Sequence, residues 1–275
     1  MLHGARRLTA ALAATLFFGA PAAAQPIDQE YTRLIREYTS DPRFLPASLT
    51  SLPVHATIPS PQEHFGTIIG APGVMHHTAE VHGYYEALAT VTPRVAIEQM
   101  GTSEEGRPFI LVIIADEQTM GRLDHYRAQL DRLADPRGLS EAEAADVIAD
   151  AKPVYYLNGG LHSPEMGSPE MLMELAYRLA AGDDPAMRAI RENVITVINP
   201  VSEPDGRDKQ VDWYYRYTKA LTTWDEPFPR SSPYWGRYVY HDNNRDGLQI
   251  SQALTKAMFD GYYRWHPTIM HDLHE

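Results

Sequence analysis

The feature that most constrains the fold is a short apolar segment near the middle of the chain, which ends in two glycines and a His-x-x-Glu pair. The segment runs from Val154 to Asn158, and Gly159 and Gly160 separate it from His162 and Glu165. A run of this length, rich in Val and Tyr and bounded by turn residues, is typical of a buried strand. The glycines let the backbone approach its neighbours closely, and catalytic groups favour the carboxyl end of such strands.

The His-x-x-Glu pair is a candidate for half of a metal site. Neutral imidazole and carboxylate groups are the ligands of catalytic zinc sites that keep one position open for water. The spacing does not decide the matter, because His77 and Glu80 have the same spacing in a segment that reads as the start of a surface helix. The chain has no Cys, so thiolate ligands and disulfides are excluded and His, Asp and Glu remain.

A helix is predicted directly after the pair, from Gly167 to Ala181. Ser168 and Pro169 at its start are interpreted as an N-cap signal. Apolar side chains then recur at helical spacing, namely Met171, Leu172, Leu175 and Leu179. The pair is therefore expected to lie in a tight turn between a strand and a helix.

A third ligand is available at the end of another apolar segment, 266–275, which contains His271 and His274. Two histidines and one glutamate would complete an open zinc set. Side chains three positions apart in an extended strand point to opposite faces, so only one of these histidines can readily meet His162 and Glu165.

Five short motifs follow one another along the chain in a familiar order. They are the segments 101–108, 160–165, 199–206, 242–245 and 272–274. Together they resemble the zinc metallocarboxypeptidases of the carboxypeptidase A type, and within that family the large secreted bacterial members, over about residues 65–275. The resemblance implies an α/β fold with one mixed β-sheet and helices on both faces, a Zn²⁺ cofactor, and peptide or protein C-termini as substrates.

The resemblance also implies roles for individual residues. The Asp-Leu-His pattern of the family selects His274 as the third ligand, with His271 as a packed or hydrogen-bonding neighbour. Asn244 and Arg245 match the pair that clamps the terminal carboxylate of a substrate, which suits an amide and a planar guanidinium. The alternative for Arg245 is a structural ion pair with Asp242 or Asp246.

An arginine that stabilises the oxyanion is expected near Arg216, with Arg207 as a competing candidate. The family takes its general-base glutamate, a substrate-contacting tyrosine and much of its side-chain pocket from sequence beyond the third ligand. We therefore expect this chain to hold the N-terminal portion of the catalytic domain, with the C-terminal part missing. Glu275 adjoins a ligand on the same strand and is not assigned as the base.

Residues 1–24 are interpreted as a secretory signal peptide, because Arg6 and Arg7 precede an apolar run that is too short to span a bilayer. A retained anchor and twin-arginine export are the alternatives. The mature chain should then begin at Gln25, be secreted or periplasmic, and contain no membrane span. The cleaved segment contains two of the 24 basic residues and none of the 36 acidic ones, which leaves a net charge of −14 and disfavours nucleic acid as a partner.

The remaining segments are assigned from their apolar periodicity and turn residues. Residues 25–64 are expected to be a wrapped N-terminal extension, and residues 65–275 the catalytic domain. Helices are predicted at 28–38, 76–90, 123–133 and 140–149, strands at 95–100, 109–115 and 193–199, and a loop at 200–208. For His76, His77 and His82 we favour solvated helix histidines over a second metal site.

The function predicted from these observations is a secreted zinc metallocarboxypeptidase. A zinc amidohydrolase acting on acylated amino acids shares the Asp-Leu-His ending and is the second enzymatic interpretation. The third interpretation is a fragment that binds metal or peptide without turnover.

Overall fold

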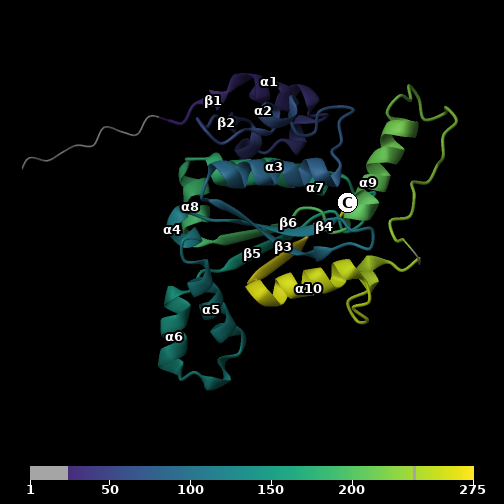
Figure 1. The fold of residues 1–275 in the computed structure, drawn as a ribbon. Coiled ribbons are helices and arrows are strands. Elements are labelled where there is room, and N and C mark those ends of the chain that lie inside the picture. Colours follow the sequence, from purple (N-terminus) through teal and green to yellow (C-terminus); the bar gives the residue numbers. More distant parts are fainter. Residues whose placement is uncertain (1–23, 238–239) are drawn as a thin grey trace, which may run out of the picture.

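A five-stranded mixed sheet forms the centre of the computed structural model, which describes residues 24–237 and 240–275 (Figure 1). Its strands, in spatial order, are β3 (Val95–Thr102), β4 (Pro108–Ile114), β6 (Ile195–Asn199), β5 (Val154–Asn158) and β7 (Ile269–Asp272). Strand β4 is antiparallel to β3 and β6, whereas β5 is parallel to β6 and β7. The predicted mixed sheet is confirmed.

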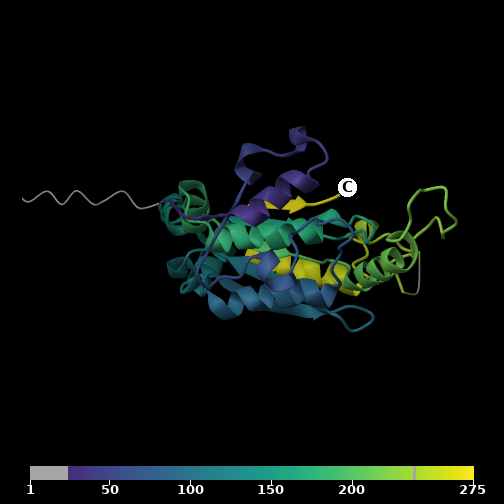
Figure 2. The ribbon, with the colours of Figure 1, turned by 90° about the horizontal axis from the view of Figure 1, so that it is seen from above.

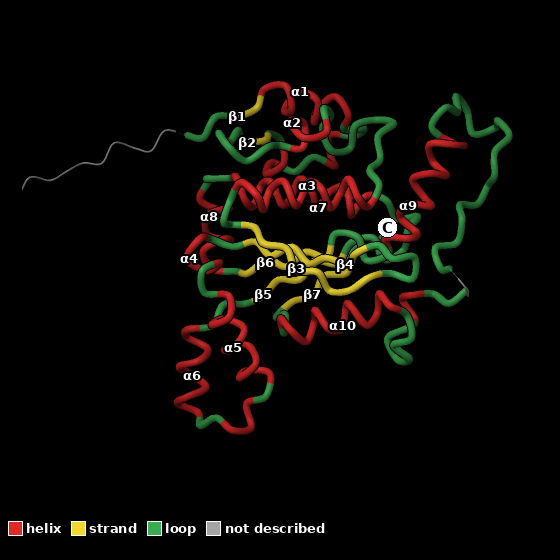
Figure 3. The backbone as a smooth tube through the Cα atoms, viewed as in Figure 1, coloured by secondary structure: helices red, strands yellow, loops and turns green. Residues whose placement is uncertain are grey.

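Helices cover both faces of this sheet, as expected (Figure 3). Helices α3 (Thr78–Val91) and α7 (Gly167–Ala181) pack on one face, and α5 (Leu123–Ala134) and α10 (Ala253–Trp265) pack on the other. The side chains of β4 alternate between two cores, because successive residues of a strand point to opposite faces. The first core contains Ile110, Val112 and Ile114, and the second contains Leu111 and Ile113.

Smaller helices complete the domain. They are α4 (Glu117–Met120), α6 (Glu141–Asp150), α8 (Pro185–Asn193) and α9 (Pro204–Trp213), with a π-helix at Tyr214–Thr218 and short 3-10 helices at Pro136–Gly138 and Asn243–Arg245. Helix α6 starts with a capping box, in which Ser140 and Glu143 satisfy each other's backbone N–H groups.

The N-terminal segment lies against the layer formed by α3 and α7 (Figures 1 and 2). It contains β1 (Ile27–Asp28), α1 (Gln29–Tyr38), β2 (Leu52–Pro53), α2 (Pro61–Phe65) and 3-10 helices at Pro42–Phe44 and Ala47–Leu49. Tyr31 of α1 is fully buried in the core, and its hydroxyl donates to Glu174 of α7 at 2.8 Å. These contacts indicate that the N-terminal segment packs against the domain. The interpretation of 1–24 as a signal peptide lies almost entirely outside the described residues.

Three predictions about secondary structure were wrong in detail. The segment 200–208 is not all loop, because α9 begins at Pro204 with the Glu203 side chain as its N-cap. Helices α8 and α10 were not predicted at all. Ser168 does not cap α7; the helix begins at Gly167, and the Ser168 hydroxyl accepts a hydrogen bond from the N–H of Gly160 at 3.0 Å.

Candidate metal centre

The turn after β5 brings the His-x-x-Glu pair against the start of α7. Gly160 has a φ of +65°, in the left-handed region that favours glycine. A Cβ atom on Gly159 would lie 2.6 Å from Cδ1 of Leu172, and one on Gly160 would lie 2.9 Å from Cγ of Pro169. The two glycines are therefore what lets the turn pack on the helix, as the sequence indicated.

His162, Glu165 and His274 converge at this turn. Nδ1 of His162 lies 3.0 Å from Oε1 of Glu165, and Nδ1 of His274 lies 2.9 Å from Oε2 of the same carboxylate. One ligand atom from each residue falls within 4.8 Å of the other two. In residues 24–237 and 240–275 this is the one group of three or more His, Asp or Glu side chains with such a geometry.

Hydrogen bonds link the three side chains of the cluster. Burial acts to raise the pKa of Glu165, but hydrogen bonds from His162 and His274 outweigh it and lower that pKa. Burial acts to lower the pKa of His274, and its hydrogen bonds to Asp272 and Glu165 outweigh this and raise it. The cluster therefore favours an ionised carboxylate at Glu165, and a divalent cation would bind as a proton leaves His274, because only neutral imidazole is a metal ligand.

A second carboxylate lies behind each imidazole. Nε2 of His162 is 3.1 Å from Oδ1 of Asp242, and Nε2 of His274 is 2.9 Å from Oδ2 of Asp272. Such partners fix the orientation of a metal-binding histidine, so that its other nitrogen faces the ion. The cluster offers two imidazoles and one carboxylate, all partly exposed, and a hydrogen bond to a second carboxylate orients each imidazole. This set fits a zinc site with one open position.

Residues 81–227 match the zinc carboxypeptidase family, and the matched range includes His162 and Glu165. The chain belongs to this family. No curated protein matches the sequence.

Several solved structures of metallocarboxypeptidases are similar to the chain. The metallocarboxypeptidase of Burkholderia cenocepacia is 16% identical, with 73% of this chain and 41% of that chain covered and a TM-score of 0.45. Carboxypeptidase A of Helicoverpa armigera is 18% identical, with 74% and 46% covered and a TM-score of 0.46. The matched region spans less than half the length of these two proteins.

Among residues 24–237 and 240–275, no other histidine joins the cluster of His162, Glu165 and His274. Nδ1 of His271 lies 3.1 Å from the hydroxyl of Tyr155, as expected for a hydrogen-bonding neighbour. His77 and Glu80 form a capping box at the start of α3, so their spacing has a purely helical cause. The interpretation of His76 and His82 as solvated was wrong, because each is only 5% exposed.

Asn244 and Arg245 lie in the 3-10 turn that follows Asp242. The backbone N–H of Asn244 donates to Oδ1 of Asp242 at 2.8 Å, so the turn is tied to the carboxylate behind His162. Both side chains are exposed, and Nη1 of Arg245 donates to the carbonyl of Asn244 at 2.9 Å. Arg245 makes no ion pair with Asp242 or Asp246 in the described part of the chain, which removes the structural alternative considered above.

The two arginine candidates for an oxyanion contact have different environments. Arg207 is 1% exposed and binds Glu170, the carbonyl of His76 and the carbonyl of Met166. A guanidinium buried in this way stabilises the fold and has no access to substrate. Arg216 is exposed in the π-helix Tyr214–Thr218, where its guanidinium lies 5.7 Å from the ring of Tyr217.

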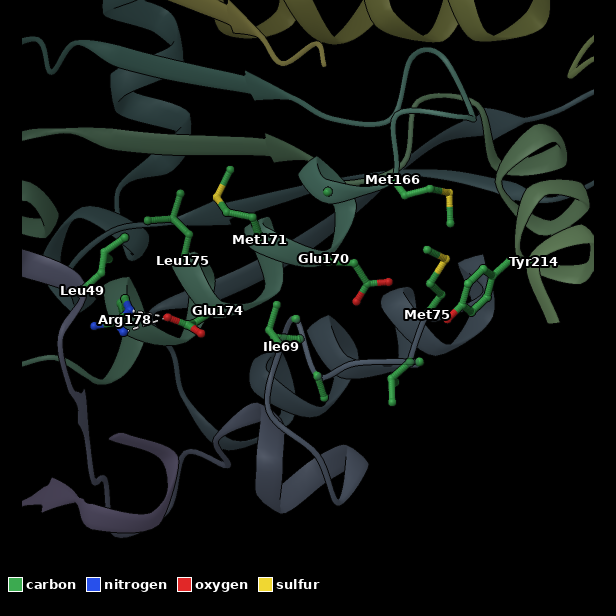
Figure 4. A pocket seen from close by; sticks show the side chains of 15 residues that line it. Leu49, Ile69, Met75, Met166, Glu170, Met171, Glu174, Leu175, Arg178 and Tyr214 are labelled. Atoms are coloured by element: carbon green, nitrogen blue, oxygen red, sulfur yellow. Dashed lines mark hydrogen bonds and ion pairs between the residues drawn. The ribbon is translucent and has the colours of Figure 1, made fainter. Parts of the chain in front are cut away.

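An apolar pocket of about 590 Å³ borders the turn on its other side, between α7 and residues 69–75 (Figure 4). Met75, Met166 and Met171 contribute to its wall. Its two carboxylates are already bound, Glu170 by His76 and Arg207 and Glu174 by Tyr31 and Arg178. None of the three candidate ligands lines this pocket.

The sequence analysis did not predict that Asp242 and Asp272 would bind the imidazoles of His162 and His274. Asp272 had a local signal, since it is two residues before His274 and such residues share one side of an extended chain. Asp242 had none, because its partner His162 is 80 residues away in the sequence.

Proposed function

We propose that this chain forms the zinc centre of a metallocarboxypeptidase that removes residues from the C-termini of peptides or proteins. The observation that supports it most directly is the convergence of His162, Glu165 and His274 with a carboxylate behind each imidazole. Membership of the zinc carboxypeptidase family supports the same conclusion.

In this proposal His162, Glu165 and His274 hold one Zn²⁺ ion. The chemistry that zinc supplies when bound is Lewis acidity, which polarises a carbonyl group and makes water more acidic. Asp242 and Asp272 hold the two imidazoles with Nδ1 directed at the ion. Because each imidazole is already hydrogen-bonded through Nε2, little reorientation is needed when the ion binds.

Substrate orientation is assigned to exposed polar groups beside the cluster. Asn244 and Arg245 bind the terminal carboxylate of the peptide, since a guanidinium presents paired donors that match a carboxylate. Arg216 is proposed to stabilise the oxyanion. We do not assign the general base to Glu203, which is buried as the cap of α9, or to Glu275, whose carboxylate accepts from the N–H of Gly167 at 2.6 Å.

We also propose that the protein is exported and that the mature chain begins at Gln25. The apolar run after Arg6 and Arg7 supports export. The Gln25 amide donates to the carbonyl of Ala181 at 2.8 Å and accepts from the N–H of Asp183 at 2.8 Å, so the proposed first residue of the mature chain is bound to the domain. No helix in the described ranges is long and apolar enough to cross a bilayer. N-terminal sequencing of exported protein that found Met1 would contradict the proposal.

Zinc analysis combined with a peptide assay tests the enzymatic proposal. The purified chain should bind one zinc ion and lose it on the change His162→Ala. A carboxypeptidase releases residues from peptides with a free C-terminus and leaves peptides with an amidated C-terminus intact. Hydrolysis of N-acyl amino acids alone would favour the amidohydrolase interpretation, and zinc binding without turnover on any substrate would favour a non-catalytic fragment.

A further inference from the structure

Three neighbouring strands end in polar residues that lie side by side across the sheet. Asn199 ends β6, Asn158 ends β5 and Asp272 ends β7. The strands are parallel, and Asn158 is in register with both of the other two residues. The three side chains thus form a short row at the carboxyl edge of the sheet, directly below the metal cluster.

The hydrogen bonds along this row run in one direction. Nδ2 of Asn199 donates to Oδ1 of Asn158 at 2.9 Å, and Nδ2 of Asn158 donates to Oδ1 of Asp272 at 2.7 Å. The hydroxyl of Ser202 lies 2.6 Å from Oδ1 of Asn158 and 2.9 Å from the carbonyl of Gly159, either of which can accept its one proton. Because Asn199 donates to the Asn158 oxygen and an ionised carboxylate only accepts, the Asn158 amide has a single orientation that satisfies both neighbours, and this orientation directs its NH₂ group at Asp272.

The other oxygen of the same carboxylate reaches the third ligand. Oδ2 of Asp272 lies 2.9 Å from Nε2 of His274, whose Nδ1 faces Glu165. We infer that Asn158 is a positioning residue for His274: it holds one oxygen of Asp272 in place, so that the other oxygen fixes the imidazole with Nδ1 directed at the metal. This inference rests on the proposed zinc centre.

The positions of the two residues in the fold show what Asn158 contributes. His274 lies two residues beyond the end of β7, so the pairing of that strand does not itself orient the imidazole. Asn158 is 0% exposed on β5, between β6 and β7, so it links the candidate ligand to the rigid interior through Asp272. A hydrogen bond to an ionised carboxylate is among the stronger ones in proteins, which suits this purpose.

Isosteric exchanges of amide and carboxylate test the inference without changing side-chain shape. Asn158→Asp replaces the donor with a second carboxylate facing Asp272. In Asp272→Asn, the single side-chain oxygen at position 272 can no longer accept from both Asn158 and His274 in the geometry of the wild type. The double variant N158D/D272N restores both bonds in a new order, because the amide at position 272 can donate to the carboxylate at 158 and still accept from His274. Asn193→Asp, an exposed change at the last residue of α8, is the matched control.

Two readouts are measured on the purified chain, zinc affinity by competition with a chromophoric chelator and the visible spectrum of the Co²⁺-substituted protein. Each single variant should bind zinc about 10- to 100-fold more weakly, which is the usual cost of losing a partner of a ligand, and should shift the Co²⁺ spectrum. The double variant should bind more tightly than either single variant. A merely structural role does not predict this recovery, because the double variant still has a buried charge at position 158.

The outcomes separate this inference from the proposed function. Zinc binding by the wild type and its loss in H162A support the zinc centre. If N158D and D272N then both keep the wild-type zinc affinity and Co²⁺ spectrum, the inference about Asn158 is wrong. It is also wrong if the double variant binds no more tightly than the single ones. Should N158D fail to fold by circular dichroism, the comparison of D272N with the double variant still decides. Absence of zinc binding in wild type overturns both proposals.

Discussion

His271 and His274 are three residues apart in the sequence, yet their imidazoles have entirely different partners. Nδ1 of His271 lies 3.1 Å from the hydroxyl of Tyr155, whereas Nδ1 of His274 lies 2.9 Å from the carboxylate of Glu165. The alternation of side chains along an extended chain separates the two. Only His274 belongs to the candidate zinc cluster.

This difference gives a matched pair of variants. His274→Ala should weaken zinc binding by more than about 100-fold, since even the loss of a group behind a ligand costs about 10- to 100-fold. His271→Ala should leave zinc binding unchanged, because it removes only a hydrogen bond to Tyr155. Chelator competition on both purified variants provides the measurement. The reverse pattern would show that the alternation argument chose the wrong histidine.

Glu203 predicts a dependence of stability on pH. Burial, reinforced by the nearby charge of Asp205, raises the pKa of Glu203 to about 8. The folded state thus holds this proton more tightly than the unfolded chain, whose carboxyl titrates near 4.5. The stabilising contribution is complete below about pH 4.5 and is lost as the pH rises towards 8, at up to about 1.4 kcal/mol per pH unit.

Glu203→Gln should therefore remove a pH-dependent loss of stability. Gln stays neutral and can still accept from the N–H of Gly206, so the variant should become more stable than wild type between about pH 6 and 8, by an amount that grows with pH. Urea unfolding at a series of pH values measures this. Glu192→Gln, an exposed change, is the control and should follow wild type. Parallel curves for E203Q and wild type would mean that Glu203 is ionised in the folded protein.

The turn that carries His162 and Glu165 could be predicted from the sequence because its causes are local. A buried strand, two glycines and a helix start all appear within the residues from Val154 to Ala181. The same reasoning failed for α10, although Leu254, Ala257, Gly261 and Trp265 follow helical spacing. Gly261 stands at a close approach of α10 to the sheet, where an added Cβ would lie 2.9 Å from Cδ1 of Leu111, while Trp265 fills the core at the end of the helix. A glycine within the buried face interrupts the apolar pattern by which a helix is recognised.

Long-range contacts explain the other failures. The Pro-Asp-Gly sequence at 204–206 is typical of a turn, but here it forms the first turn of α9. Asp205 is held there by the hydroxyl of Ser103 at 2.6 Å and by Arg107 at 2.8 Å, both about 100 residues earlier in the chain. His76 was misread for the same reason, since its ring is bound at 2.7 Å by Glu170, a residue of another helix. A single sequence has no signal for such partners.

Arg207 and Arg216 should differ sharply in their effect on stability. Arg207→Ala removes the guanidinium from the buried Glu170 carboxylate, which keeps only its contacts with His76, and removes a donor from the carbonyls of His76 and Met166. Breaking a buried ion pair on one side costs about 3–5 kcal/mol. Arg216→Ala removes an exposed side chain and should change stability by less than about 0.5 kcal/mol. Denaturant unfolding compares the two. Similar losses in both variants would contradict the structural role given to Arg207.

The last prediction concerns the proposed carboxylate clamp. Arg245 is exposed, lies three residues after Asp242 and donates only to the carbonyl of Asn244 in the described structure, so its guanidinium is available to a substrate carboxylate. Hydrogen bonds to charged groups contribute about 1.5–3 kcal/mol, so in a protein that carries the complete catalytic domain Arg245→Ala should lower kcat/KM for peptides with a free C-terminus by about 10- to 100-fold. Arg245→Lys keeps the charge but loses the paired donors, and it should recover only part of the loss.

Arg264→Ala, a change to a partly exposed arginine of α10 whose charge partners are Asp260 and Glu98, is the matched control and should have no effect. Zinc content measured alongside must remain that of wild type, which separates a substrate contact from damage to the metal centre. If R245A retains full activity on free C-termini, or loses activity only together with zinc, Arg245 does not bind the substrate carboxylate.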